Sequence, residues 1–320
     1  MGEGLGELVC SFMAEKLQLC IVGGGPAGLT AGLYSSRSRL KTLLIERGVL
    51  GGQIANADRV DNYPGFPRGI PGLELAGLIH QQAVSYGLET LSAEVTRLAP
   101  RLGENMVSTT EGDFTAQAVI IAGGSQFRKL DVPGESEFLG KGVSYCATCD
   151  GPLPIFRGKV VAVVGGGDAA LTDALYLSRF ASSIKVIHRR SELRAVKLLQ
   201  EKARAEPKIE FVWDSVVTGI KGGKLVAELT LKNTRSGKTS SLAVGGVFVA
   251  IGLVPNTGYL RGVLPLDEQG YIIADGLMAT GVAGVFAAGD IRRSSVKQAV
   301  VAAGEGAVAA LSAEKFIGSL

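Results

Sequence analysis

The chain has 320 residues, more than a typical single domain of about 100–200 residues, so two domains are expected. Its formal net charge is only +3, which does not suggest nucleic acid as a partner. Although 46% of the residues are hydrophobic, Gly or charged residues interrupt the apolar runs well short of the ~20 residues that a membrane span needs. We therefore expect a soluble protein with no nucleic acid or membrane partner.

Residues 1–15 are expected to form an N-terminal extension. They carry Glu3, Glu7 and Glu15, and no basic segment precedes an apolar stretch, so they are not typical of a secretory signal. A cytoplasmic location is therefore expected.

A dinucleotide-binding turn follows the first predicted strand, Leu17–Val22. The strand runs into a glycine-rich turn and then into a stretch with helical spacing that ends at Arg37. Gly23 permits the tight turn, Gly25 lets a pyrophosphate approach the backbone, and Gly28 allows close packing of the helix. The N-terminus of the helix supplies backbone donors and a positive partial charge.

The second predicted strand, Thr42–Ile45, ends in Glu46. A carboxylate at this place accepts hydrogen bonds from the ribose hydroxyls of a dinucleotide and repels a 2′-phosphate. The first unit therefore predicts a site for FAD or NAD, and not for NADP.

The strand–turn–helix pattern recurs at Val160–Val164, which runs into the turn 165–170 and then into a helix through about Phe180. The chain therefore contains two nucleotide-binding units. Further buried strands that end in small residues are predicted at 118–124, 246–252 and 284–290.

The acid of the first unit is replaced in the second unit by arginines. Strand Ile184–Ile187 ends in His188-Arg189-Arg190, and we expect Arg194 to lie one helical turn further on. Guanidinium groups pair well with a phosphate, so this segment favours NADPH. The alternative is a solvated basic patch at the start of a helix.

Cys146 and Cys149 are the closest pair among the four cysteines, which occupy positions 10, 20, 146 and 149. Two cysteines at this spacing lie on one face of a helical first turn, where the dipole and free backbone donors lower a thiolate pKa. A disulfide can close across the turn, and the neighbouring Asp150 can pass protons to and from a departing thiolate. The alternative is a buried and unreactive pair.

No metal site is expected. Zinc would need a second pair of ligands, and the only histidines are His80 and His188. Cys20, inside an apolar strand, is expected to be a small buried hydrophobe.

From about Leu17 to Leu320 the sequence resembles the low-molecular-weight, bacterial-type thioredoxin reductases, which are NADPH-dependent. The segments that carry the resemblance are Gly23 to Gly28, Gly51 to Ile54, Asp61 to Gly65, Cys146 to Asp150, Gly165 to Ala170, His188 to Arg190 with Arg194, Phe248 to Gly252, and Gly289-Asp290 followed by Gln298-Ala299.

The resemblance implies an α/β fold with two Rossmann-like three-layer nucleotide-binding domains, in which the NADPH domain is inserted into the FAD domain. The expected boundaries are 16–129 and 255–320 for the two parts of the FAD domain, and 130–254 for the NADPH domain with its redox cysteines. The chain is expected to cross between domains near 127–133 and 252–257, where Pro, Gly and Asn cluster. A homodimer is also implied.

The resemblance also implies that electrons pass from NADPH through FAD and the dithiol to thioredoxin or a thioredoxin-like protein. Cys149 would face the flavin, and Cys146 would attack the substrate disulfide. Because the dithiol and the nicotinamide must use the same flavin face in turn, we hypothesise a domain rotation about the two crossings. The residues expected at the FAD site are Gly23, Gly25, Pro26, Ala27, Gly28, Glu46, Arg47, Gly52, Gln53, Ile54, Asn62, Val95, Ala122, Gly123, Gly124, Gly289, Asp290, Lys297, Gln298 and Ala299, and those at the NADPH site are Gly165, Gly167, Asp168, Ala169, Ala170, His188, Arg189, Arg190, Arg194, Ile251 and Gly252.

The chain departs from the family at a few positions. Gly123 stands where Thr is common, Lys297 replaces a common Arg, and Thr172-Asp173 occupies the place of two Glu residues. Ala170 in place of the third Gly is within tolerance. Two other activities of the same fold stay open: a reductase that takes electrons from ferredoxin, and a dithiol oxidase that passes them to oxygen.

Overall fold

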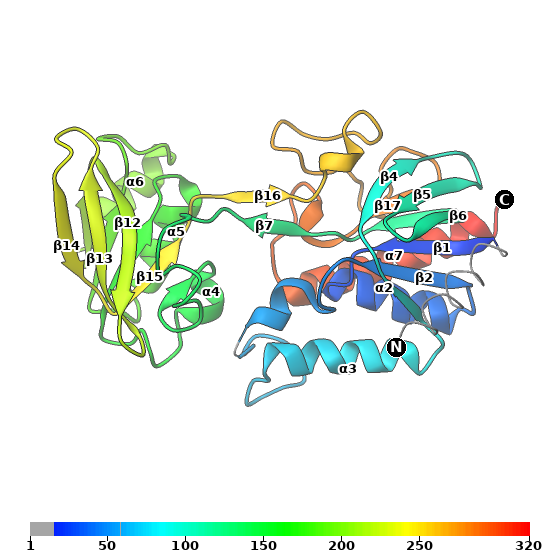
Figure 1. The fold of residues 1–320 in the computed structure, drawn as a ribbon, viewed down its shortest axis with the longest axis horizontal. Coiled ribbons are helices and arrows are strands. Elements are labelled where there is room, and N and C mark those ends of the chain that lie inside the picture. The colour runs from blue at the N-terminus through cyan, green and yellow to red at the C-terminus, as the bar shows by residue number, and fades with distance from the viewer. Residues whose placement is uncertain (1–15, 58) are drawn as a thin grey trace. The chain divides into compact units, whose positions relative to one another are not determined.

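The computed structural model describes residues 16–57 and 59–320, which divide into two units (Figure 1). Unit 1 combines the described residues up to Gln126 with Val254–Leu320, and unit 2 is Phe127–Leu253. The expected extension 1–15 and Cys10 lie outside the described residues. Strands β7 (Ser125–Phe127) and β16 (Leu253–Pro255), where the chain passes between the units, pair with each other.

Unit 1 is built on a seven-stranded sheet in the order β3-β2-β1-β6-β5-β4, with β17 also paired to β6. The pairs β1–β2, β1–β6, β2–β3 and β6–β17 are parallel, whereas β4–β5 and β5–β6 are antiparallel. The strands are β1 (Leu17–Val22), β2 (Thr42–Glu46), β3 (Glu89–Ser92), β4 (Val95–Ala99), β5 (Asn105–Thr109), β6 (Gly112–Ile121) and β17 (Val285–Ala287).

Helices cover this sheet because its central strands are apolar on both faces. Figure 1 shows α2 (Pro26–Arg37) and α7 (Ala299–Ile317) together beside the sheet. A Cβ on Gly306 of α7 would lie 2.1 Å from the Ala27 carbonyl oxygen of α2, so the two helices approach closely. The remaining elements of unit 1 are α3 (Gly72–Val84) and the short helices η1 (Gly52–Asn56), η2 (Gly258–Leu260) and η3 (Gly289–Ile291).

Unit 2 repeats the layered arrangement with a five-stranded parallel sheet in the order β11-β10-β9-β15-β8. An antiparallel sheet, β12-β13-β14, completes the unit. The strands are β8 (Val143–Ser144), β9 (Val160–Val164), β10 (Ser183–Ile187), β11 (Ile209–Val212), β12 (Ser215–Gly222), β13 (Val226–Asn233), β14 (Thr239–Ala243) and β15 (Gly246–Val249), and the helices are α4 (Ala147–Asp150), α5 (Asp168–Leu177) and α6 (Lys197–Ala205).

The α/β fold with parallel sheets is confirmed, and so are the two strand–turn–helix units. The helix expected to run to about Phe180 ends earlier, at Leu177, and turns of the chain follow it. Within the described ranges, no helix combines the length and the apolar character that crossing a membrane requires.

Candidate redox and nucleotide sites

In the turn after β1, the backbone requires glycine at Gly23 and Gly28 but not at Gly25. Gly23 has φ +107°, and a Cβ on Gly28 would lie 1.8 Å from the Gly23 carbonyl oxygen, so neither position accepts a side chain. Gly25 has φ −75°, and a Cβ there would meet nothing within 4 Å. Helix α2 starts directly behind it at Pro26, with no side-chain cap on its N-terminus. The space in front of Gly25 is therefore open for a ligand and faces unsatisfied backbone donors.

Glu46, at the end of β2, is held by the backbone of this turn. Its Oε2 accepts a hydrogen bond from the Gly24 N–H at 2.6 Å, and its Oε1 accepts one from the Gly48 N–H at 2.8 Å. Each carboxylate oxygen has a further lone pair for a ribose hydroxyl. Glu46 is therefore an oriented acceptor beside the open glycine. Its neighbour Arg47 forms an exposed ion pair with Glu94 at 3.3 Å.

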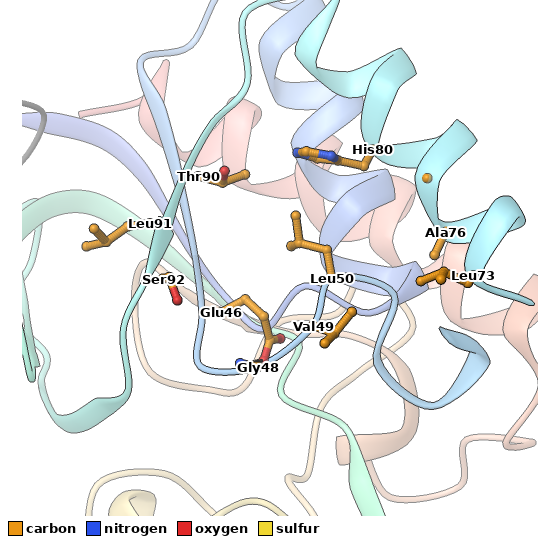
Figure 2. Close-up of a pocket in the computed structure, with 11 residues that line it drawn as sticks. Glu46, Gly48, Val49, Leu50, Leu73, Ala76, His80, Thr90, Leu91 and Ser92 are labelled. Atoms are coloured by element: carbon orange, nitrogen blue, oxygen red, sulfur yellow. Dashed lines mark hydrogen bonds between the residues drawn. The ribbon is translucent and has the colours of Figure 1, made fainter. Parts of the chain in front are cut away.

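A pocket of about 410 Å³ begins beside Glu46 and extends between α3 and β3 (Figure 2). Figure 2 shows the His80 ring pointing from α3 toward the strand that carries Thr90, with Glu46 at the opposite end. The Nε2 atom of His80 is buried and has no hydrogen-bond partner among the described residues. The walls between these polar ends include Val49, Leu50, Leu73, Ala76 and Leu91.

The predicted flavin residues of the other chain end lie in the same unit. The Asn62 amide donates a hydrogen bond to Gln298 Oε1 at 3.0 Å, although the two residues are 236 positions apart. Lys297 Nζ donates to the Asp290 carbonyl oxygen at 2.7 Å and lies 4.2 Å from the centre of the Tyr271 ring. Burial lowers the pKa of Lys297 and raises that of Asp290.

Glu305 supports the Gly289–Asp290 turn and was missed by the sequence analysis. Its Oε2 accepts a hydrogen bond from the Gly289 N–H at 2.7 Å and lies 3.7 Å from Arg292 Nε. Arg292 is itself buried, with Nη1 2.7 Å from Met278 Sδ. The signal that could have identified Glu305 is an acid in the middle of α7, surrounded by small and apolar residues.

The remaining predicted flavin residues lie at the ends of elements of unit 1. Gln53 and Ile54 are in η1, and Gln53 Nε2 donates to the Ser125 carbonyl oxygen at 2.5 Å. A Cβ on Gly123 would make only van der Waals contacts, so the absence of Thr here leaves local space. Gly52 opens η1, Val95 begins β4, Ala122, Gly123 and Gly124 follow β6, and Ala299 begins α7.

Cys146 and Cys149 form a disulfide at the start of α4, with their Cα atoms 5.3 Å apart. Cys146 is the N-cap of this helix, and its Sγ accepts a hydrogen bond from the Cys149 N–H at 3.2 Å. Both residues are partly exposed. A backbone N–H that donates to Sγ favours the thiolate over the thiol once the disulfide is reduced.

Asp150 is linked to the cysteines by Ser144, which the sequence analysis also missed. The Ser144 hydroxyl donates to Asp150 Oδ2 at 2.6 Å and accepts a hydrogen bond from the Cys146 N–H at 3.1 Å. Ser144 is buried at the end of β8 and so has a defined orientation. The arrangement connects a carboxylate and a hydroxyl to the backbone of the redox pair.

The second glycine turn, after β9, repeats the geometry of the first. A Cβ on Gly165 would lie 2.5 Å from the Ala250 carbonyl oxygen, whereas a Cβ on Gly167 would meet nothing within 4 Å. Asp168, at the start of α5, accepts a hydrogen bond from the Val196 N–H at 2.8 Å. Ala169 and Ala170 continue α5, and Ile251 and Gly252 follow β15.

We expected a helical turn in the segment after β10, but this segment is not helical. Helix α6 starts only at Lys197, and the N–H groups of Arg194 and Ala195 donate to the Gly166 carbonyl oxygen at 2.7 and 3.2 Å. The expectation of one helical turn between Arg190 and Arg194 is therefore wrong, because these N–H groups are bonded to the glycine turn instead. The side chains of Arg189, Arg190 and Arg194 are exposed.

His188 supports this loop from below. It is 5% exposed, its ring packs against Gly166, and Nε2 lies 3.0 Å from the Glu192 carbonyl oxygen. Burial lowers the pKa of His188, which favours a neutral ring. The His188 ring is therefore buried under the loop, whereas the arginine side chains are exposed. The described residues form no group of three or more His, Cys, Asp or Glu side chains that could hold a metal.

Asp173 of α5 is a partly buried acid that we expect to destabilise the protein at high pH. Burial raises its pKa to about 6. The stability that the protonated form contributes is complete below the pKa of an unfolded Asp, near 3.8, and is lost as the pH rises through 6. Asp173→Asn should therefore raise the free energy of unfolding by about 2 kcal/mol at pH 8 and leave it unchanged near pH 4.

Urea unfolding of both proteins at a series of pH values measures this difference. Glu201→Gln, on the exposed side of α6, is the matched control and should have no effect at either pH. A difference between Asp173→Asn and wild type that did not depend on pH would contradict the burial argument.

Residues 17–306 match the family model described as pyridine nucleotide-disulphide oxidoreductase. The thioredoxin reductase of Chlamydia pneumoniae is 43% identical to this chain, over 94% of this chain and 99% of its own length. That of Bacillus subtilis (strain 168) is 43% identical over 96% of each chain. The bifunctional thioredoxin reductase/thioredoxin of Mycobacterium leprae is 43% identical over 94% of this chain and 66% of its own.

The solved structures agree with these relatives. The thioredoxin reductase structure from Streptococcus pyogenes MGAS5005 superposes with a TM-score of 0.90 at 40% identity, over 95% of this chain and 99% of its own. The structure from Giardia duodenalis gives a TM-score of 0.88 at 39% identity, over 95% and 99%.

Proposed function

The chain belongs to the pyridine nucleotide-disulphide oxidoreductase family, and within it to the low-molecular-weight thioredoxin reductases, and on this basis we propose that it reduces the disulfide of thioredoxin with electrons from NADPH, through FAD and the Cys146–Cys149 pair. The observation that carries the proposal is the disulfide at the start of α4, in a chain that also holds two open glycine turns.

The residues of unit 1 fit FAD. The open space at Gly25, the free N-terminus of α2 and the oriented Glu46 suit a pyrophosphate and a ribose without a 2′-phosphate. We assign the pocket beside Glu46 to the adenosine end. Asp290, held by the Gly289 turn, would bind the ribitol, and Gln298 would lie at the flavin ring.

The residues of unit 2 fit NADPH. Gly167 leaves the same open space as Gly25, and exposed arginines replace the acid of the first unit. Bound FAD would supply the means to accept a hydride from NADPH and deliver two electrons to a disulfide. Thr172 and Asp173, which depart from the family pattern, lie within α5, after the glycine turn. They replace neither the glycines of this turn nor the arginines.

The dithiol performs the exchange with thioredoxin. The Cys146 thiolate attacks the thioredoxin disulfide, forms a mixed disulfide and releases one thioredoxin thiolate. The Cys149 thiolate then attacks Cys146 Sγ, which releases the second thioredoxin thiolate and restores the Cys146–Cys149 disulfide. Asp150 would take up and return the proton of a thiol, and its hydrogen bond to Ser144, which in turn bonds the Cys146 N–H, supports this role.

We propose thioredoxin or a thioredoxin-like protein as the partner, which the fused relative supports, and a cytoplasmic homodimer by similarity to the family. The role of Cys146 as the attacking thiol, the domain boundaries and the domain rotation stay predictions.

Anaerobic stopped-flow absorbance tests the electron source. We expect NADPH to bleach the flavin about 100-fold faster than NADH at equal low concentration, because NADH lacks the phosphate that the arginines bind. Bleaching by neither nucleotide would favour the ferredoxin-linked alternative. Rapid reoxidation by air with release of peroxide, and no transfer to thioredoxin, would favour the dithiol oxidase.

A further inference from the structure

The turn between β13 and β14 is organised by its own hydrogen bonds and carries an exposed arginine, Arg235. Asn233 Oδ1 accepts hydrogen bonds from the N–H groups of Arg235 and Ser236, at 3.1 and 2.8 Å, and from the Ser236 hydroxyl at 3.0 Å. An Asn side chain that bonds the following backbone in this way organises the turn by itself. The backbone from which Arg235 projects is therefore fixed.

This turn is bonded to the loop that carries the predicted 2′-phosphate residues. The Thr234 hydroxyl lies 3.2 Å from the Arg189 carbonyl oxygen, and the Thr234 N–H donates to the Asp214 carbonyl oxygen at 2.6 Å. The Asp214 N–H in turn points to the Arg190 carbonyl oxygen at 3.4 Å. Hydrogen bonds therefore connect the three segments around residues 190, 214 and 234 to one another.

The guanidinium of Arg235 reaches the same loop. Its Nη2 donates to the Ser191 hydroxyl at 3.2 Å, and Ser191 directly follows Arg189 and Arg190. Its Nε lies 3.2 Å from Asp214 Oδ1. A guanidinium has five N–H groups, so these contacts leave most of them available to a ligand. The side chain of Arg235 is 70% exposed, whereas that of Asp214 is only 17% exposed.

We propose that Arg235 is a fourth cation of the 2′-phosphate site, oriented by Asp214, and that it increases the preference for NADPH over NADH. The proposal rests on the proposed function, in which Arg189, Arg190 and Arg194 bind this phosphate. Asp214 and Ser191 hold the guanidinium at the loop that carries Arg189 and Arg190 before a ligand arrives, which reduces the entropy lost on binding. The alternative is that Arg235 serves only as the counterion of Asp214. The variants described below separate the two roles.

Binding of adenosine 2′,5′-bisphosphate and of 5′-AMP to the full-length flavoprotein is measured by titration calorimetry. We expect Arg235→Ala to weaken binding of the bisphosphate about fivefold and to leave 5′-AMP unchanged, as for an exposed charge pair. Arg235→Lys keeps a point charge and should lose about half of that effect in free energy. Lys224→Ala is the matched control, because it removes one exposed positive charge in the turn between β12 and β13, at the other end of β13.

The Asp214→Asn background separates phosphate binding from neutralisation of Asp214. Asp214 has φ 48°, a conformation that Asn also adopts, so this variant should keep the fold. If Arg235 contacts the phosphate, Arg235→Ala still weakens bisphosphate binding in this background, but by less than fivefold, because the guanidinium has lost the carboxylate that orients it. If the substitution has no effect there, Arg235 is only a counterion and the inference is wrong.

Two further outcomes distinguish this inference from the proposed function. If the wild-type protein binds the bisphosphate no better than 5′-AMP, the NADPH site itself is wrong and the inference falls with it. If Arg190→Ala abolishes the preference for the bisphosphate and Arg235→Ala leaves it intact, only the role of Arg235 is wrong.

Discussion

Replacing Cys146 by Ser should lower the rate of thioredoxin reduction by roughly 10⁴-fold or more, as is typical when a nucleophile is removed. A serine hydroxyl at this position is not ionised near neutral pH and cannot attack a disulfide. The same variant should still show flavin bleaching by NADPH, because Cys146 takes no part in that transfer. The rates are measured by thioredoxin turnover and by stopped-flow absorbance.

The companion variant Cys149→Ser tests which thiol attacks the substrate. Cys146 should then form a mixed disulfide with thioredoxin that no second thiol resolves, and the adduct should be visible by intact-protein mass spectrometry. Cys146→Ser should form no such adduct. The reverse pattern, or full turnover by Cys146→Ser, would overturn the assigned roles.

Cys20 provides the matched control for both variants. It is fully buried in β1, and burial raises the pKa of its thiol to about 12, so it stays protonated and unreactive. Cys20→Ala should leave thioredoxin reduction unchanged apart from a modest loss of stability.

Gly25→Ala should lower the affinity for FAD by at least about 100-fold without unfolding the chain, because the new methyl group occupies the space that a pyrophosphate needs. Gly25 has φ −75°, which any residue adopts, and a Cβ there meets nothing within 4 Å. The backbone itself should therefore tolerate alanine, at a cost of about 1 kcal/mol or less for a changed N-cap.

Gly28→Ala is the informative contrast, one helical turn away. Its Cβ would lie 1.8 Å from the Gly23 carbonyl oxygen, so α2 must move away from the end of β1. We expect a loss of about 3 kcal/mol or more in the free energy of unfolding, with or without FAD, as for an overpacked core site. Flavin content after purification and thermal unfolding of the FAD-free proteins measure the two effects. If Gly25→Ala kept its flavin, or unfolded as Gly28→Ala does, the open-space argument would be wrong.

The sequence by itself determined the elements of this protein that depend on neighbouring residues. Strand β1, the turn at Gly23 to Gly28 and helix α2 were predicted together because their signals are local: an apolar run, glycines at set spacings, and helical periodicity. The same holds for the second unit after β9. The pair at Cys146 and Cys149 was recognisable because its spacing alone brings the two sulfurs within reach of a disulfide.

Only the tertiary structure decided how distant segments complete each site. Asn62 bonds Gln298, Glu305 bonds Gly289, and Arg235 bonds Ser191, and none of these pairs is related by helix or strand periodicity. The loop that carries Arg194 was predicted as a helical turn because local spacing allows one. Its N–H groups instead donate to Gly166, a residue of another turn. Such contacts depend on how sheets and helices bring remote backbone and side chains within hydrogen-bond distance, which a pattern of neighbouring residues does not specify.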